Sequence, residues 1–345
     1  MVNPFPAPYP PPKNIAFPLP DLAASYDIGH GSVYQTPVAY DWNLTIERQL
    51  SSAWLVRAAY VGSHASHLME TVELSPVVFP TKLHLYPEYS DIAMASQDVN
   101  SSYNSLQLSA QKRFSRGLTL LANYTWSKSI DDLPNGQDIT TVVVGGNSPI
   151  PWYLPGRHQF DRGPSEFDHT HRFVGSFSWA LPALAGSPAV VRFVAGGWQL
   201  SGLFSAQSGG PMTITAGKDQ SGTALGTDRG VLTGNGYGSG ACGSAKPCVD
   251  WLNPTAFSVP AAGTYGSLGK GALRGPNLIT YDGGLLKDFR VHGEHMKFQF
   301  RAEFFNLFNR VNFNNPALSI SGAGFGRITG AGDPRIGQLA LKFLF

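Results

Sequence analysis

Charged side chains are scarce in this 345-residue chain. Asp, Glu, Lys and Arg make up 14% of the residues, whereas a soluble globular domain usually has roughly 25%. The formal net charge is only +2, so the sequence does not indicate a basic surface for nucleic acid, and we expect no nucleic-acid partner. Long apolar runs are missing too. No segment approaches the roughly 20 apolar residues that a membrane-spanning helix needs, which excludes a helical membrane protein.

Cysteine is almost absent. Cys242 and Cys248 lie close together in a stretch rich in Gly and Ser. A structural metal site needs further ligands, and the neighbouring residues supply none. The pair therefore predicts a small loop closed by a disulfide in an oxidising compartment. We expect no metal and no cofactor.

Signatures of export and catalysis are also missing. The first twelve residues lack the positive n-region and apolar h-region of a signal peptide, so we expect any export signal to precede Met1. His169 and His171 could share a strand face, but they are better explained as polar residues at a strand rim. Glu303 has no second carboxylate or nucleophile at a recognisable spacing, so we predict no catalytic residue and no enzyme activity.

Glycine, proline and aromatic residues are plentiful, which fits an all-β chain with long loops. There are 39 Gly and 26 Pro, and aromatics make up 12% of the chain. The last eleven residues, 335–345, alternate strictly: Leu339, Leu341, Phe343 and Phe345 would share one face of a strand. Such a strand fits lipid on one side and a polar lumen on the other. It also fits the buried last strand of a soluble β-sandwich.

The same alternation predicts nine strands. They cover 40–50, 54–62, 102–113, 118–126, 172–181, 198–206, 279–289, 296–308 and 335–345. Residues 1–38 are Pro-rich and irregular, and we expect them to be part of an extracellular loop. Residues 39–345 are then the C-terminal portion of the barrel domain described next.

The connections between these strands alternate between short and long. The short ones are 51–53, 115–116, 182–196 and 290–295, and the long ones are 62–101, 127–168, 208–278 and 309–334. Outer-membrane barrels have short periplasmic turns and long extracellular loops, whereas a soluble sandwich has no reason to gather its long loops at one end. We therefore predict an all-β fold, an antiparallel up-and-down transmembrane β-barrel that is partial, with about nine strands of a larger barrel. Its long loops would be extracellular, and its short turns and C-terminus periplasmic.

Period two also assigns each strand residue to a face. The predicted lipid-facing and aromatic-belt residues are Trp42, Trp54, Tyr60, Tyr124, Trp126, Trp179, Trp198, Phe298, Phe300, Phe304, Phe343 and Phe345. The predicted lumen-facing residues are Arg57, Asn123, Arg301 and Glu303. A charge in the middle of the lipid face would cost roughly 2–4 kcal/mol. We expect none there; Lys112 lies close to a turn, where its ammonium group can reach water.

Several segments, taken together, resemble a known family. They are Y-D-W-N-L-T-I-E-R-Q-L (40–50), Y-V-G-S-H-A-S-H-L (60–68), Y-N-S-L-Q-L-S-A-Q-K-R-F-S-R-G-L-T (103–119), Y-T-W-S-K-S-I-D-D (124–132), F-D-H-T-H-R-F-V-G-S-F (167–177), G-W-Q-L-S-G-L-F-S-A-Q-S-G-G-P (197–211), L-R-G-P (273–276), F-R-A-E-F-F-N-L-F-N (300–309) and the terminal strand. In order and spacing this set resembles the C-terminal barrel of TonB-dependent outer-membrane receptors, in particular the Oar-like group. The resemblance covers the chain from Asn3 to Phe345.

The resemblance implies more than the residues alone. Barrels of that family have about 22 strands around an N-terminal plug, so we expect this chain to supply the last nine and to lack the plug and the TonB box. The implied function is substrate binding at the cell surface and TonB-driven import. The implied partners are outer-membrane lipid, the barrel-assembly machinery, the TonB complex through the missing plug, and an unknown small-molecule, glycan or peptide ligand. The alternatives are a TonB-independent porin or adhesin and, from a different class, a soluble secreted glycan-binding β-sandwich.

Overall fold

The computed structural model describes residues 25–28, 35–87, 92–115, 117–134, 148–241, 249–292 and 296–344. Cys242, Cys248 and Phe345 lie outside these ranges. The proposed disulfide and the position of the last aromatic residue therefore stay predictions. In the described part of the chain, no helix has the length and apolar character required to cross a membrane.

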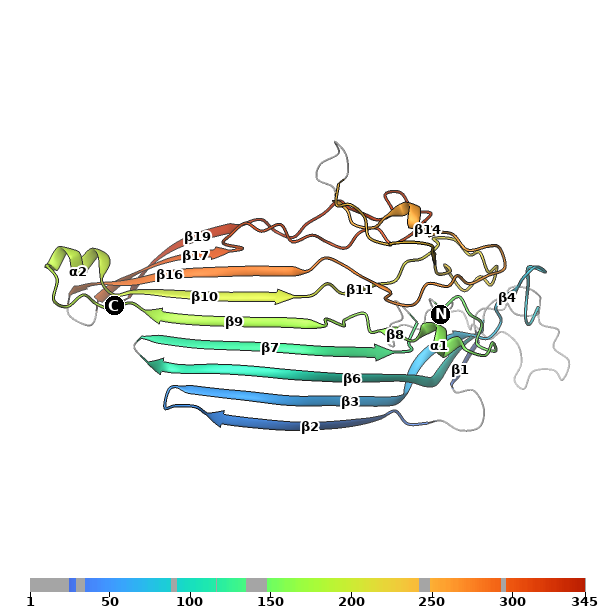
Figure 1. Cartoon of the computed structure of the whole chain (residues 1–345), viewed down its shortest axis with the longest axis horizontal. Coiled ribbons are helices and arrows are strands. Elements are labelled where there is room, and N and C mark those ends of the chain that lie inside the picture. Colours follow the sequence, from blue (N-terminus) through green and yellow to red (C-terminus); the bar gives the residue numbers. More distant parts are fainter. Residues whose placement is uncertain are drawn as a thin grey trace, which may run out of the picture.

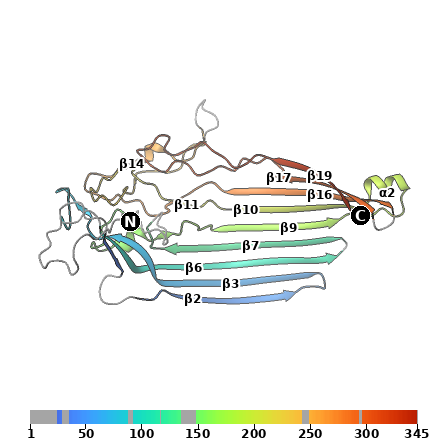
Figure 2. The ribbon, with the colours of Figure 1, turned by 180° about the vertical axis from the view of Figure 1, so that it is seen from behind.

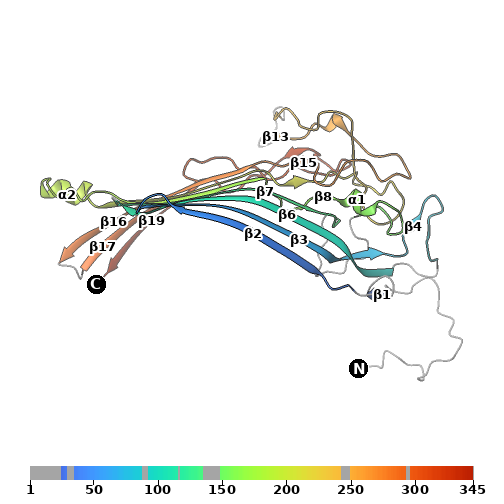
Figure 3. The ribbon, with the colours of Figure 1, turned by 60° about the horizontal axis from the view of Figure 1, so that its bottom comes forward.

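Nine strands form one continuous sheet in which each strand pairs with its neighbour in the chain (Figure 1). They are β2 (Val38–Gln49), β3 (Trp54–Glu73), β6 (Ile92–Ser115), β7 (Leu118–Asp131), β9 (His171–Ala180), β10 (Trp198–Gln207), β16 (Leu278–His292), β17 (Met296–Phe305) and β19 (Ile336–Leu344). All eight pairings are antiparallel. The sheet is curved, with β2 and β19 at its two edges (Figure 3). The predicted up-and-down arrangement of nine strands is confirmed.

The register of the pairs divides the sheet into two chemically different faces. Directly opposed residues lie on the same face. On one face Leu108 is opposite Tyr124 and Phe298 is opposite Phe343. We call this the apolar face, and the predicted lipid-facing residues within the described strands all lie on it. The other face, here the polar face, carries pairs such as Ser109 with Asn123.

Long and short connections lie at opposite ends of the sheet. Figure 2, seen from behind, shows the marked C-terminus beside the short connections and the long loops gathered at the far end. The tightest hairpin joins β6 to β7. Gly117 there has φ +79, and a Cβ at this position would stand 2.3 Å from the carbonyl oxygen of Ala180. Only glycine fits this turn without a shift of the backbone.

Predicted boundaries of β3, β6 and β7 are wrong because these strands continue past them; β7, expected to end at 126, ends at Asp131. We expected a strand end at Gly62 and a strand start at Ser102, but β3 and β6 stay paired as far as Glu73 and Ala93. The register shifts between Ala65 and Glu70, which breaks the alternation on which the prediction rested. β17, in contrast, ends at Phe305 rather than at 308, because Asn306 has a left-handed backbone (φ 50).

The short-turn end also holds a helix that was not predicted. The connection 182–196 contains α2 (Ala189–Ala195), which extends past the sheet beside the C-terminus (Figure 1). At the other end, the Pro-rich first segment contributes β1 (Ser25–Ile28), which runs parallel to β6. This segment is therefore not irregular throughout.

The long loops are folded rather than irregular. They form short strand pairs: β4 (Val77–Val78) with β5 (Leu83–His84), β11 (Pro211–Met212) with β15 (Leu273–Arg274), β12 (Val231–Leu232) with β14 (Phe257–Ser258), and β13 (Val249–Asp250) with β18 (Arg327–Ile328). They also contain α1 (Arg157–Asp161), β8 (Gly163–Pro164), which pairs with β7, and the 3-10 helix η1 (Pro254–Ala256). The prediction that 208–278 is irregular is therefore wrong, because this segment contains short paired strands.

A buried charge lies on the apolar face near its short-turn rim, outside the middle of that face, so the expectation of no charge in the middle is not contradicted. Lys287 is opposite both Trp198 and Phe300, on the face that carries the predicted lipid-facing aromatics. It is only 3% exposed. Its ammonium group donates to the backbone oxygens of Val194, at 3.0 Å, and Gly196, at 2.7 Å. The helical connection supplies these acceptors, so the lysine is satisfied without a carboxylate.

Candidate functional site

The long loops pack into one body at the end of the sheet opposite the C-terminus. We call it the loop assembly, and it comprises the described parts of 74–91, 148–170, 208–277 and 306–335. Its buried apolar core consists of Met212, Ile214, Leu252, Ala256, Phe257, Leu268, Leu273 and Phe325. Leu252 and Ile214 are completely buried. A core of this kind holds the loops in a defined shape, as a binding surface requires.

Buried ion pairs join the loop assembly to itself and to the ends of the strands. Arg229 donates to Asp161 at 2.8 Å, and both side chains are inaccessible to water. Lys270 pairs with Asp131 at the end of β7 and also donates to the carbonyl oxygen of Leu133 at 2.7 Å. These links fix the loops to the sheet, because separating either partner would leave a buried charge.

A third cluster lies where the extensions of β3 and β6 meet α1. Arg157 forms a bidentate pair with Glu70, with one of its two bonds at 2.9 Å, and lies 3.4 Å from Asp98. His158 lies next along the helix and contacts Asp98 at 3.1 Å. Two carboxylates therefore face one guanidinium and one imidazole.

Burial and these contacts change the acidity of the cluster. Glu70 lies well past Tyr60 along β3, beyond the predicted aromatic belt and outside the membrane-crossing part of the strand. Burial raises the pKa of Glu70 to about 7, against the opposing effect of Arg157. The hydrogen bond to Asp98 raises the pKa of His158 above its ordinary value. Glu70 consequently changes charge near neutral pH, and His158 keeps its proton to a higher pH than an ordinary imidazole.

The same cluster is the one group in the described ranges whose ligand atoms could surround a metal ion. Atoms of Glu70, Asp98 and His158 all lie within 4.8 Å of one another. However, both carboxylate oxygens of Glu70 already accept bonds from Arg157. A cation would have to displace that guanidinium, so the arrangement favours an ion-pair cluster over a metal centre. Sequence analysis missed it, because its members come from three distant segments and share no spacing.

A hollow on the polar face is the best candidate for a ligand site. It measures about 320 Å³ and lies where β3, β6 and β7 enter the loop assembly. Apolar and aromatic side chains alternate with hydroxyl groups and one carboxylate around it: Leu68, Met69, Val99, Tyr103, Leu133 and Phe167 with Ser63, Ser101, Ser102, Ser129, Ser165 and Asp131. A mostly apolar concave wall with a few polar groups is typical of small-ligand sites.

The loops themselves form a second, open hollow of about 410 Å³. Phe160, Tyr265 and Pro260 contribute to its wall. It lies beside the Asp161–Arg229 pair, and Arg229 stacks over the Phe160 ring at 4.8 Å from the centroid. Its wall is formed by loops alone, so its shape depends on the ion pairs that hold them.

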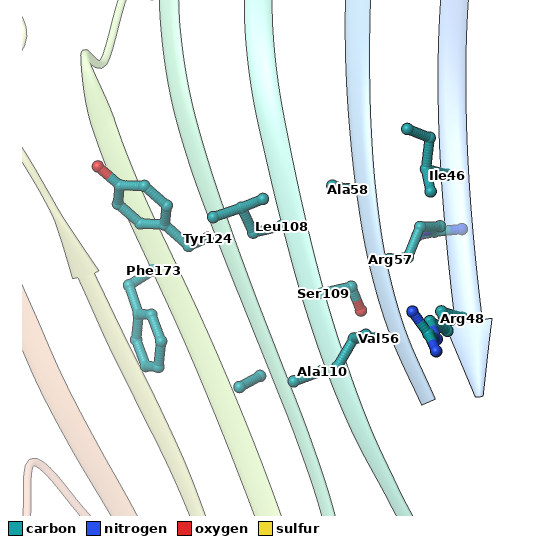
Figure 4. A pocket seen from close by; sticks show the side chains of 11 residues that line it. Ile46, Arg48, Val56, Arg57, Ala58, Leu108, Ser109, Ala110, Tyr124 and Phe173 are labelled. Atoms are coloured by element: carbon teal, nitrogen blue, oxygen red, sulfur yellow. The ribbon is translucent and has the colours of Figure 1, made fainter. Parts of the chain in front are cut away.

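A third hollow lies on the apolar face and has a different character. It is a groove of about 430 Å³ between rows of side chains, with Ile46, Leu108, Tyr124 and Phe173 along it and Arg48 at one end (Figure 4). Polar side chains do not converge in its middle. Such a lining suits hydrocarbon rather than a polar ligand.

The predicted polar-face residues share a face but do not form one site. Arg301 donates to the side-chain oxygen of Gln299 at 2.7 Å, and Glu303 accepts from Gln338. The described partners of both charged groups are therefore side-chain amides. Registers place Arg57 and Asn123 on the same face, several strands away. Whether this face lines a lumen stays a prediction.

The two candidate histidines do not share a partner. His169 contacts the carbonyl oxygen of Ser208 at 2.7 Å through Nδ1. His171 lies 2.8 Å from the hydroxyl of Tyr124 and stacks on its ring. Each imidazole thus has its own local partner, as the expectation of rim residues implied.

Two solved structures are similar to this chain at low sequence identity. One is the outer membrane transporter YddB from Escherichia coli, with 12% identity and a TM-score of 0.48 over 90% of this chain and 33% of that one. The other is the FrpB iron transporter from Neisseria meningitidis (F3-3 variant), with 10% identity and a TM-score of 0.40 over 91% of this chain and 33% of that one. The chain therefore spans about a third of the length of either structure. No curated protein matches the sequence.

A family model for an outer membrane beta barrel domain matches residues 1–338. This match covers nearly the whole sequence, and it agrees with the antiparallel nine-strand sheet and the two chemically different faces. The chain therefore belongs to the outer membrane beta barrel domain family, which places it in the outer membrane.

Proposed function

We propose that this chain is part of a TonB-dependent receptor of the Oar-like group, which binds a substrate at the cell surface and imports it. The set of segments from 40–50 to the terminal strand supports this assignment within the family. In the proposed orientation the long loops are extracellular, and the short turns and C-terminus face the periplasm. The receptor works by binding and transport, not by catalysis.

The folded state of the loop assembly is the observation that carries the proposal. A passive pore needs only loops that leave its entrance open. Here the loops have their own buried core, the Arg229–Asp161 pair joins two loops, and Lys270–Asp131 anchors them to the end of β7. This construction holds a surface of fixed shape at the entrance, which is what recognition of one ligand requires.

The hollow on the polar face is where we propose that the ligand first binds. It lies at the junction of strands and loops, so a ligand there would touch both the anchored loops and the barrel wall. Tyr103 and the largely exposed Phe167 offer ring faces, and the serine hydroxyls offer hydrogen bonds. This combination suits a small molecule, a glycan or a peptide of modest size.

Binding to TonB tests the proposal most directly. The protein should be isolated from the outer membranes of the cells that produce it, with an affinity tag beside the exposed Ala241, so that the whole gene product is retained. We expect it to bind the purified periplasmic domain of TonB. Failure to bind that domain would contradict TonB coupling.

Conductance in planar bilayers separates the alternatives. A plugged receptor should give no stable open channel, whereas a porin gives a steady conductance. An open channel together with absent TonB binding would favour the porin. If the protein forms no open channel and does not bind TonB, but still binds a ligand at the cell surface, the result would favour an adhesin.

A further inference from the structure

The short-turn end of the sheet carries an apolar surface that the transport proposal does not use. In α2 every residue is exposed, and Val190, Val191, Phe193 and Val194 are 74%, 43%, 59% and 60% exposed. Four large apolar side chains within one short helix are costly in water. One contact of these side chains with the sheet is between rings, where Phe193 meets Phe289 at a centroid distance of 5.2 Å.

The helix is fixed onto the apolar face, not onto the lumen side. Phe289 lies on that face opposite Phe298. Trp198 donates its indole N–H to the carbonyl oxygen of Val194 at 2.9 Å. The ammonium group of Lys287 reaches the oxygens of Val194 and Gly196 and lies 5.0 Å from the centre of the Trp198 ring. The exposed side chains of α2 are thus continuous with the surface that the family assignment places in lipid.

On the apolar face, the charged side chains described at this end are all cationic. On the apolar face Arg48 and Lys112 lie near the short turns, and Arg192 is exposed on the helix. The described apolar-face positions around them include no carboxylate. A short apolar segment flanked by cationic side chains suits the boundary between acyl chains and anionic headgroups.

We propose that α2 is an interfacial anchor that lies in the phospholipid leaflet at the short-turn rim of the barrel. Val190, Phe193 and Val194 enter the region between headgroups and acyl chains, and Arg192 binds anionic phosphate. Lys287 holds the helix in place by bonding to the backbone oxygens at its C-terminal end. The occupant of this surface is lipid, and TonB and the transported ligand play no part in it.

Spin labels test the proposal in isolated outer membranes. Cys242→Ser and Cys248→Ser remove the native thiols, and a nitroxide is attached to Val190→Cys or Val194→Cys. We expect collisions with oxygen to exceed those with a water-soluble nickel chelate, as at the lipid-face reference Leu341→Cys. At the exposed loop reference Ser239→Cys the order should reverse. If nitroxides at 190 and 194 collide more with the nickel chelate than with oxygen, as at Ser239→Cys, the proposal is overturned. This holds whatever the label at Leu341→Cys reports.

A matched pair of substitutions gives a second, independent readout. Val190→Asp puts a carboxylate on α2, and Val311→Asp puts one on the loop assembly at a valine that is 58% exposed. We expect only Val190→Asp to lower the urea midpoint of the protein in vesicles that contain phosphatidylglycerol. Equal midpoints for the two variants would overturn the proposal. Loss of TonB binding would leave both readouts unchanged, so the two proposals fail separately.

Discussion

At the scale of single residues, Lys287 is a charged side chain on the apolar face, and backbone hydrogen bonds compensate for its burial there. Period two on β16 runs from Leu285 to residue 287 and places a charge on the apolar face. Its two acceptors lie at the C-terminal end of a helix that the sequence does not predict, because 189–195 is apolar except for Arg192 and is shorter than the helical pattern needs. The residue could be assigned to its face from sequence, but its partners could not.

Replacement of Lys287 by methionine should destabilise the protein. The lysine is opposite Trp198, the first residue of β10, so it lies near the rim, where a charge on the lipid face costs only about 0–1 kcal/mol. Hydrogen bonds from a charged group contribute about 1.5–3 kcal/mol. The net loss should appear as a lower urea midpoint in vesicles.

Lys297→Met is the matched control for that experiment. Lys297 pairs with Asp288 at 2.9 Å, and both side chains are about a third exposed, at 37% and 33%. An exposed pair contributes about 0–1 kcal/mol. If Lys287→Met and Lys297→Met shift the midpoint equally, the proposed role of the buried lysine is wrong.

The cluster of Glu70 and His158 predicts a dependence of stability on pH. Both folded-state pKa values are raised, to about 7 for Glu70 and in the upward direction for His158. A group with a raised folded pKa binds its proton more tightly when folded, so its contribution is present at low pH and is lost as pH rises through the folded value. The thermal midpoint should therefore decrease as pH rises from about 4.5, the ordinary pKa of Glu70, to about 7, its folded value.

A double variant tests whether Glu70 and His158 cause this decrease of the thermal midpoint with pH. In the double variant Glu70→Gln, His158→Gln neither group titrates, so the midpoint should change much less over the same interval. In the unmodified protein Asp98 does not titrate over this interval, because hydrogen bonds from His158 and Ser96 outweigh burial and lower its pKa. An undiminished pH dependence in the double variant would contradict the assignment.

At the scale of elements, alternation was a good guide to the membrane-crossing strands and a poor one elsewhere. β10 and β19 begin within a residue of their predicted starts, because one face of each is uniformly apolar. β3 and β6 run on beyond their predicted limits, because there they contact the loop assembly on one side and the mixture of side chains no longer alternates. The core of the loop assembly was not predictable, since short strand pairs separated by many residues leave no period.

The buried pair of Arg229 and Asp161 should be essential for the order of the loop assembly. Arg229→Met leaves a buried carboxylate without its partner, which costs about 3–5 kcal/mol. Faster hydrogen exchange across 208–241 and 249–277 should result. The double variant Arg229→Met, Asp161→Leu removes both charges and should restore much of the protection, because an apolar pair of similar volume is often as stable.

Arg327→Gln is the matched control for the hydrogen-exchange experiment on Arg229→Met. Arg327 pairs with Asp250 at 3.3 Å, and 55% of the arginine side chain is exposed. Its loss should cost about 0–1 kcal/mol and leave exchange nearly unchanged. Similar exchange in Arg229→Met and Arg327→Gln would show that the buried pair does not hold the loops.

At the scale of the whole molecule, the sequence predicted the two faces and the two ends of the sheet but not the candidate site. Faces follow from period two, and ends follow from loop length, so both are local properties. The hollow beside Tyr103 and the Glu70 cluster arise only when strand extensions and distant loops come together. Position 70, position 98 and position 158 carry no common signal before folding.

The central claim is that the apolar face contacts lipid while the polar face does not. Single cysteines on β17, in a background of Cys242→Ser and Cys248→Ser, test it in intact outer membranes with a water-soluble maleimide. The account predicts that Phe300→Cys and Ala302→Cys stay unlabelled, whereas Arg301→Cys and Glu303→Cys react. Equal labelling of neighbouring positions along this strand would contradict the account.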